Sequence, residues 1–311
     1  MRIFVAGASG AIGRPLVRRL LTAGHEVTGM TRRPDRAAEI DAAGATGVVS
    51  DVFDRTALEQ AVAAARPDVV VHQLTALPQA LDVSKPDVYD ATNRVRAEGT
   101  RNLIEAALEA GAGRMVAQSI AFLYAPVGGW VKEEGAPTMD DAPGHFGAAV
   151  KAMLNAERQV LGTPGIDGLV LRYGFFYGPG TAYATDSYYA DEAKRRRLPV
   201  VGKGDGMASF IHVDDAAAAT VAACERGEPG IYNVADDEPA PMREWAPVFA
   251  AAVGAPRPLR VPGWIAGLVA GRVVVGLATT SRGASNANAK RELGWEPAIP
   301  TWRQGFREAL A

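Results

Sequence analysis

The sequence predicts an α/β protein with a doubly wound parallel sheet followed by a smaller lobe. Short apolar runs alternate with amphipathic stretches up to about residue 174, a glycine triplet follows the first run, and prolines become frequent after Gly174. Buried parallel strands are near-continuous apolar runs, and alternating strands and helices are joined by right-handed crossovers. We therefore expect a sheet domain over residues 1–174 and a smaller α+β lobe over residues 175–311.

The elements of the first domain follow one another in a regular order. The expected strands are at residues 3–6, 26–31, 47–50, 68–72, 114–119 and 168–172. The expected helices are at residues 11–23, 55–65, 92–110 and 146–161. Gly24 ends the first helix, since glycine tolerates the left-handed conformation that follows many helices. Val95, Gly99 and Leu103 share one face of the long helix, which we expect to be buried.

Composition excludes several classes of protein. The chain has 311 residues, of which 48% are apolar and 22% charged, and its net charge of −2 favours neither nucleic acid nor an anionic membrane. Its most apolar late segment, residues 265–278, is interrupted by three glycines and Arg272. The single cysteine, Cys224, lies in an apolar stretch and excludes an internal disulfide. We expect a cytoplasmic protein that binds a small molecule and neither nucleic acid nor membrane.

A glycine motif between the first strand and the first helix carries the first functional signal. It reads Gly7-Ala8-Ser9-Gly10-Ala11-Ile12-Gly13. Glycines at such a turn let the backbone approach a pyrophosphate, and the free N–H groups of the helix start face its oxygens. The motif predicts a Rossmann-type dinucleotide site, with contacts from Gly7, Ser9, Gly10, Ala11, Ile12 and Gly13.

The G-x-x-G-x-x-G spacing and later segments resemble the extended short-chain dehydrogenase/reductase superfamily, the epimerase/dehydratase-like proteins. The later matches are Asp51-Val52, the segment 72–76, Leu171-Arg172-Tyr173-Gly174 with the segment 175–180, the segment 209–215, and the segment 289–297. The resemblance implies cofactor contacts at Asp51, Val52, Leu74, Thr75, Ala76, Gln118, Lys151, Tyr173, Phe175 and Phe176. It also implies that the second lobe binds substrate.

The end of the second strand predicts which dinucleotide binds. An acidic side chain there would bind the ribose 2′-hydroxyl of NAD, but this chain has Thr31-Arg32-Arg33. Two guanidinium groups suit the 2′-phosphate of NADP(H), so Arg32 and Arg33 predict that cofactor. The alternative is that both arginines are solvated turn residues.

The usual catalytic residues of the superfamily are incomplete. Members that transfer hydride have a serine and a Tyr-x-x-x-Lys pair. The tyrosine and lysine of this pair lie on one face of a helix. Lys151 is present, but Gly147 stands four residues before it, and alignment on Tyr124 puts Ile120 at the serine position, one residue after Ser119. The candidate catalytic residues are therefore Lys151, Tyr124 and Ser119, within an atypical branch.

Three functions follow from this incomplete set. The first is NADPH-dependent reduction of a ketone, the second a non-catalytic NADP(H) sensor, and the third a sugar-nucleotide epimerase or dehydratase. Aromatic residues favour the first, with a flat substrate. The candidate substrate contacts are Phe122, Tyr124, Phe146, Gly147, Phe176, Tyr183 and Tyr188. Gly147 is expected to leave space for a substrate that supplies its own proton, and the chain is similar to ketoreductases of aromatic polyketide (angucyclinone) pathways in antibiotic biosynthesis.

Two further expectations concern metals and assembly. Asp214 is expected to cap the helix that follows it, with His212 packed at the helix start, and the histidines show no metal-ligand spacing. The helices 92–110 and 146–161 correspond to the usual dimer interface of the superfamily. Because the first of them is densely charged, we expect a monomer or a weak homodimer.

Overall fold

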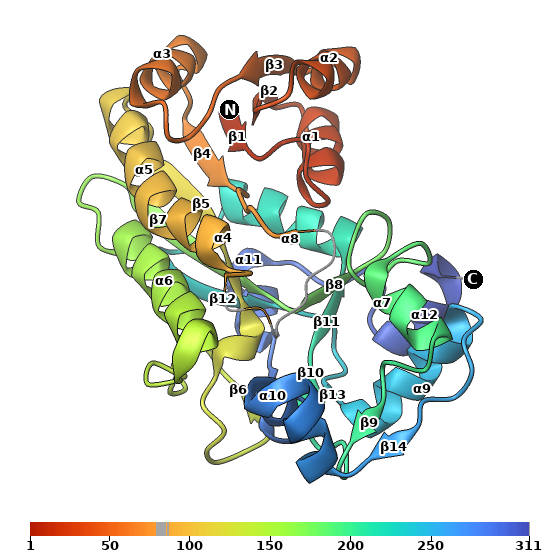
Figure 1. Cartoon of the computed structure of the whole chain (residues 1–311). Coiled ribbons are helices and arrows are strands. Elements are labelled where there is room, and N and C mark those ends of the chain that lie inside the picture. The colour runs from red at the N-terminus through yellow and green to blue at the C-terminus, as the bar shows by residue number, and fades with distance from the viewer. Residues whose placement is uncertain (79–84, 86, 311) are drawn as a thin grey trace.

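A computed structural model describes residues 1–78, 85 and 87–310 and confirms the predicted doubly wound sheet (Figure 1). Seven strands, all paired in parallel, lie in the order β12-β7-β5-β4-β1-β2-β3. They are β1 (Arg2–Ala6), β2 (Glu26–Thr31), β3 (Thr46–Val49), β4 (Val69–His72), β5 (Arg114–Ile120), β7 (Asp167–Tyr173) and β12 (Gly230–Val234). The strand order reverses between β1 and β4, and an open α/β sheet binds its ligand at such a point.

Helices cover both faces of this sheet (Figure 1). One layer holds α1 (Gly13–Thr22), α2 (Pro34–Ala42), α8 (Val213–Glu225) and α11 (Ala287–Leu293). The other holds α3 (Arg55–Ala65), α4 (Asp90–Arg94), the π-helical turn η1 (Val95–Gly99), α5 (Thr100–Glu109) and α6 (Gly144–Leu161). Successive strand residues serve opposite layers: Val5 and Val71 pack with Leu16, whereas Phe4 and Val70 pack with Leu58.

The C-terminal part of the chain contributes both to the sheet and to a second lobe. Strand β12 lies beyond the expected boundary at residue 174 yet pairs with β7, so the seventh strand comes from the later part of the chain. The boundary itself stays a prediction. The second lobe packs around buried aromatic rings, among them Phe210, Trp245, Phe249 and Phe306.

The elements of this lobe are short. Its helices are α7 (Tyr188–Lys194), α9 (Met242–Ala252), α10 (Gly263–Thr280) and α12 (Trp302–Ala309). Its paired strands are β8 (Phe175–Tyr177) with β11 (Phe210–His212), β9 (Val200–Val201) with β14 (Arg260–Val261), and β10 (Met207–Ala208) with β13 (Ala240–Pro241). The turn η2 (Ala121–Leu123) and the pair β6 (Val131–Lys132) with β15 (Gly283–Ala284) complete the elements.

Local differences from the sequence predictions have identifiable causes. Helix α2 was not predicted, although Pro34 at its first position is a common start signal. The glycines of α10 do not prevent a helix but kink it at Gly271, where φ is 84°. Within the described ranges, we find no helix with the length and apolarity that crossing a bilayer requires.

The expected cap of α8 is wrong. His212, not Asp214, is the N-cap, since its Nδ1 accepts a hydrogen bond of 3.2 Å from the Asp214 backbone N–H. Asp215 is buried, and its carboxylate accepts from the backbone N–H groups of Ala298 (2.9 Å) and Ile299 (3.0 Å). These contacts tie α8 to the C-terminal segment.

A buried carboxyl group lies where β12 passes into the second lobe. The Asp236 backbone N–H donates to the Phe210 carbonyl at 2.7 Å, and its Oδ1 accepts from the Glu238 backbone N–H at 3.2 Å. Its Oδ2 has no hydrogen-bond partner among the described residues. Burial raises the pKa of Asp236 to about 8, so the folded protein holds this proton at neutral pH.

Asp236→Asn should therefore change how stability depends on pH. The folded state keeps a proton that the unfolded state releases above its ordinary pKa of 3.8, so wild-type stability falls from there up to about pH 8 and is level above. We therefore expect the unfolding free energy of the variant, minus that of wild type, to increase as the pH rises from about 4 to about 8. The increase should be at least ~1.4 kcal/mol, the equivalent of one pKa unit. Urea unfolding at about pH 5, 7 and 9 measures this, with the exposed Asp186→Asn as control. An equal difference at all three pH values would contradict the assignment.

Candidate cofactor and active site

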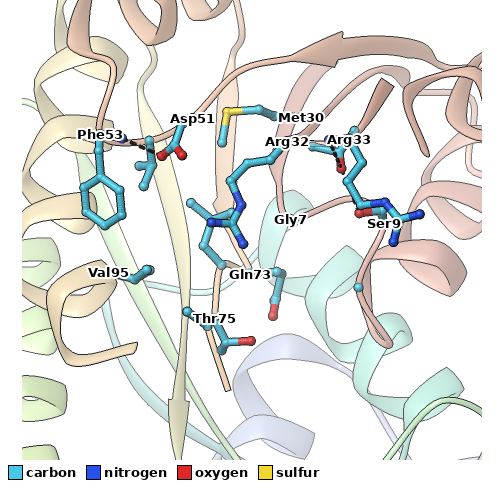
Figure 2. A pocket seen from close by; sticks show the side chains of 15 residues that line it. Gly7, Ser9, Met30, Arg32, Arg33, Asp51, Phe53, Gln73, Thr75 and Val95 are labelled. Carbon is cyan, nitrogen blue, oxygen red and sulfur yellow. Dashed lines mark hydrogen bonds between the residues drawn. The ribbon is translucent and has the colours of Figure 1, made fainter. Parts of the chain in front are cut away.

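A cleft of about 190 Å³ lies at the carboxyl ends of β1, β2 and β4, beside the reversal of strand order (Figure 2). Its lining residues are Gly7, Ser9, Gly10, Met30, Thr31, Arg32, Arg33, Asp51, Val52, Phe53, Gln73, Leu74, Thr75, Ala76 and Val95. The structure thus brings together four separate segments that the sequence nominated for one dinucleotide. Their roles in binding stay predictions.

The glycine loop forms one wall of this cleft. Gly7 has a φ of 95°, and a Cβ there would lie 2.7 Å from the Gln73 carbonyl oxygen. A Cβ on Gly13 would lie 2.2 Å from the Gly7 carbonyl oxygen, so Gly13 lets the helix pack against its own loop. Gly10 lines the cleft, and a side chain there would meet only the Gly7 oxygen, at 3.3 Å. This bare backbone cradle at a helix start fits a pyrophosphate.

Three of the predicted loop contacts, Ala11, Ile12 and Gly13, do not line the cleft. Ile12 is the N-cap residue of α1 and is buried in the core, and Ala11 lies outside the lining. The sequence nominated them by position in the motif, which does not distinguish a side chain that faces the ligand from one that packs behind the loop.

The two arginines after β2 have different surroundings. Arg33 pairs with Asp35 at 2.5 Å and turns toward Ser9, whereas Arg32 extends over the cleft (Figure 2). Arg32 makes no hydrogen bond or ion pair with any described residue. Ser9 Oγ lies 3.0 Å from Thr31 Oγ1. The Asp35 carboxylate already neutralises Arg33, so Arg32 is the cation available to a ligand.

The opposite wall contains residues that sequence reasoning missed. The turn after β3 is closed by Asp51 Oδ1, which accepts from the Phe53 N–H at 3.0 Å, and Phe53 lines the cleft. Val95 reaches the cleft from η1, whose extra residue breaks the α-helical register. Met30 and Thr31 line the cleft next to Arg32, and Gln73 lies in the segment 72–76 that the resemblance had already matched. No sequence pattern marks the π turn.

The side chains of His72 and Gln118 fix the loop after β4 through hydrogen bonds to its backbone. His72 Nδ1 accepts from the Leu74 N–H at 3.2 Å, and its Nε2 donates to Thr100 Oγ1 at 3.0 Å. Burial lowers the pKa of His72 to about 4, so the ring is neutral. Gln118 Nε2 donates to the Leu74 carbonyl at 2.9 Å and lies outside the cleft. His72 and Gln118 therefore position the loop, whereas the resemblance implied a cofactor contact for Gln118.

The two candidate catalytic hydroxyls lie in a buried polar network. Ser119 Oγ donates to Glu157 at 2.5 Å, and Glu157 pairs with Arg172 at 2.7 Å. Tyr124 donates to Asn233 Oδ1 at 2.6 Å and accepts from Arg172 at 3.1 Å. Ser119 is 2% exposed and Tyr124 is 1% exposed, and neither lines the cleft. Both hydroxyls are thus used within the core, and their catalytic roles stay predictions.

The expected space beside Gly147 does not exist. A Cβ on Gly147 would lie 1.6 Å from the Ala142 carbonyl oxygen, so backbone fills the place of the missing side chain. Phe146, one residue earlier, is buried with Leu123 and Val150. Neither residue offers the expected substrate contact. Lys151 is exposed on α6 and lies outside the cleft lining, so its role at the nicotinamide ribose stays a prediction.

The remaining aromatic candidates separate into core and surface. Tyr183 packs against Phe210 and other rings of the second lobe and is buried. Phe122 and Phe175 are half-buried and stack with centroids 4.3 Å apart and ring planes 7° from parallel. Phe176 is half-buried beside Tyr173, with centroids 5.2 Å apart, and Tyr188 is half-buried. The Phe122–Phe175 stack is thus the candidate aromatic surface.

Known proteins resemble this chain over both of its parts. Residues 3–235 match the model of the NAD dependent epimerase/dehydratase family. A Streptomyces 3-diazoavenalumate denitrifying reductase is 48% identical over 307 residues, which cover 98% of this chain and 99% of that protein. A 2-alkyl-3-oxoalkanoate reductase of Stenotrophomonas maltophilia is 31% identical over 269 residues, 83% and 77% of the two chains. The structure of a Thermus thermophilus UDP-glucose 4-epimerase in complex with NAD superposes with a TM-score of 0.74 at 27% identity, covering 100% and 98%.

Restoring the tyrosine four residues before Lys151 should not restore an acid. Both Gly147→Ala and Gly147→Tyr must displace the Ala142 backbone, so we expect each to lower the unfolding free energy, Gly147→Ala by about 1–3 kcal/mol. Thermal unfolding measures the loss. Gly276→Ala is the matched control, because it is also a helical glycine and nothing lies within 4 Å of its added Cβ. A stable, more active Gly147→Tyr variant would contradict the crowding at this position.

Proposed function

This chain belongs to the NAD dependent epimerase/dehydratase family, and we propose that within it the protein reduces an aromatic diazo compound with loss of nitrogen. It is an NAD(P)H-dependent oxidoreductase, as its reductase relatives and family membership establish. The observation that carries the proposal is the absence, at the expected positions, of a hydroxyl free to donate a proton. Ser119 and Tyr124 are committed to the buried network, and Gly147 has no room for a side chain.

An aromatic diazo compound is a hydride acceptor that does not need a general acid in the site. When bound, the reduced nicotinamide supplies a hydride. An arene diazonium ion that gains one hydride and loses the C–N electron pair with the departing N₂ becomes a neutral arene, so no proton is consumed. A ketone that gains a hydride becomes an alkoxide, and a positioned acid typically contributes about 10²–10⁴-fold to its formation. The relative at 48% identity is named for the first kind of reaction.

An aromatic substrate is supported by the Phe122–Phe175 stack. The two rings are nearly parallel and half-buried, and they lie in η2 and β8, the elements that follow β5 and β7. Offset stacking on such a pair is worth about 0.5–1.5 kcal/mol beyond area burial. We propose that this pair receives the ring of the substrate and that the expected contacts at Phe146 and Tyr183 belong to the core.

Arg32 supports NADPH as the physiological cofactor. Its guanidinium extends over the cleft without an ion pair among the described residues, and no acidic residue ends β2. A 2′-phosphate would gain a charge-assisted hydrogen bond from it.

Arg32→Ala should therefore weaken NADPH and spare NADH. A hydrogen bond to a charged group is worth about 1.5–3 kcal/mol, so we expect the NADPH Kd to rise roughly 10- to 100-fold. Titration calorimetry with both cofactors measures this. Arg33→Ala is the matched control, with a smaller effect, because Asp35 already pairs with Arg33. Equal losses for NADPH and NADH would remove Arg32 from the selectivity argument.

Ketone reduction is the second candidate. The relative at 31% identity is a 2-alkyl-3-oxoalkanoate reductase, and the sequence resembles ketoreductases of aromatic polyketide pathways. With the Gly147 space filled, a ketone substrate would have to supply its proton elsewhere in the site.

The two candidates differ in stoichiometry and in isotope pattern. With 3-diazoavenalumate and NADPH deuterated at both C4 positions, we expect one N₂ released per NADPH oxidised and deuterium on the product ring carbon. Mass spectrometry measures both. If the protein reduces members of a panel of 3-oxoalkanoates and aromatic ketones but not the diazo compound, ketone reduction is the function and the diazo proposal is wrong.

Variants of the two hydroxyls provide a separate check. We expect Ser119→Ala and Tyr124→Phe to keep kcat/KM within about 10-fold of wild type, whereas loss of a general acid costs about 10²–10⁴-fold. Thermal unfolding of each variant separates a stability defect from a catalytic one. A loss above 10²-fold in Tyr124→Phe, with the folded protein intact, would return the acid role to Tyr124.

A further inference from the structure

The side-chain amide of Gln73 brings an unsatisfied hydrogen-bond acceptor to the cleft. Gln73 follows β4, lines the cleft and is 7% exposed (Figure 2). Its Nε2 donates to the Tyr173 hydroxyl at 3.1 Å. Its Oε1 is buried and has no hydrogen-bond partner among the described residues.

A chain of hydrogen bonds fixes which end of this amide is free. Thr220 Oγ1 donates to the Ala216 carbonyl at 2.7 Å, so its single proton is used. The Tyr173 hydroxyl, 2.7 Å from Thr220 Oγ1, must then be the donor in that pair. Tyr173 is left to accept, and only the amide nitrogen of Gln73 can donate to it. The free group of Gln73 is therefore an acceptor, Oε1.

The chemistry of this acceptor selects its ligand group. A buried acceptor without a partner is unfavourable, and a ligand donor relieves that cost. Phosphate oxygens are acceptors and cannot serve, whereas a hydroxyl can. Gln73 directly follows β4, across the strand-order reversal from Arg32 and Asp51, which follow β2 and β3. The dinucleotide of a doubly wound sheet crosses that reversal, with one nucleotide on each side.

We propose that Gln73 Oε1 accepts a hydrogen bond from a ribose hydroxyl in the nicotinamide half of the bound dinucleotide. Tyr173 and Thr220 are positioning residues that hold the amide in this orientation. The inference rests on the cofactor site proposed above. In this proposal Tyr173, which is 1% exposed and was expected to contact the cofactor, acts through Gln73 instead.

Two ligands test the assignment to one half of the cofactor. In Gln73→Met the amide is replaced by an apolar chain of similar size, and we expect the NADPH Kd to rise about 3- to 10-fold, as for one lost neutral hydrogen bond. The Kd for 2′,5′-ADP, which lacks the nicotinamide half, should not change. Titration calorimetry with each ligand gives both values. An unchanged NADPH Kd, or an equal rise for 2′,5′-ADP, overturns the inference.

A double-mutant cycle tests the positioning role. Tyr173→Phe keeps the ring but frees the amide to rotate, so we expect it to weaken NADPH on its own and to add nothing in the Gln73→Met background. Additive losses would mean that Tyr173 acts independently of Gln73 and would overturn this part. Tyr173→Phe also serves as the second variant if Gln73→Met does not fold.

Gly10→Asp separates failure of this inference from failure of the cofactor site. A carboxylate at Gly10 enters the cleft, so NADPH binding should be lost. If Gly10→Asp abolishes binding while Gln73→Met leaves it unchanged, the site stands and the Gln73 inference falls. If Gly10→Asp binds NADPH normally, the cofactor lies elsewhere and both fall.

Discussion

The buried ion pair between Arg172 and Glu157 organises the side of the protein that faces the second lobe. Both side chains are at most 5% exposed, and the guanidinium makes two hydrogen bonds to the carboxylate, at 2.9 and 2.7 Å. Arg172 also donates to Tyr124 and to the Glu134 carbonyl at 3.2 Å. Breaking such a pair by removing one partner leaves an uncompensated charge and typically costs about 3–5 kcal/mol. One interaction thus joins β7, α6, and the segments that follow β5 and β6.

That ion pair also holds the two candidate hydroxyls in the core. Ser119 satisfies a Glu157 oxygen, and Tyr124 connects Arg172 to Asn233 on β12. Removing either hydroxyl from this network to serve a substrate would take one hydrogen bond from a buried charged group. A hydroxyl that is hydrogen-bonded in the core cannot at the same time donate its proton to a substrate. In this structure Ser119 and Tyr124 both donate within the core.

The sequence was most informative where the backbone itself makes the site. Local patterns predict the succession of strands and helices along the chain, the glycine loop and the arginines after β2. Each of these depends on residues within one turn or one element. The sequence puts Ser119 one residue before the usual serine position, and in the structure its hydroxyl is bonded to Glu157. It failed at Gly147, because the turn leading into α6 brings the Ala142 carbonyl against the first turn of the helix, and no periodicity reports such a contact. The expected burial of Val95 is confirmed, but its place in the cleft was not predicted, since an inserted residue shifts helix phase without a compositional mark.

The π turn at η1 makes one wall of the cleft depend on the number of residues in the chain as well as on their identity. Helix α5 is anchored by Leu103 and Ile104 in the core, while Thr92 of α4 is fully buried and accepts from the Ala76 N–H at 3.3 Å. Deleting one residue between these anchors would rotate α4 by about 100° relative to α5. Thr92 would leave Ala76, and Val95 would leave the cleft. A single-residue insertion or deletion in this helix therefore changes the shape of the cleft wall by rotating α4 relative to α5. A substitution does not produce this rotation.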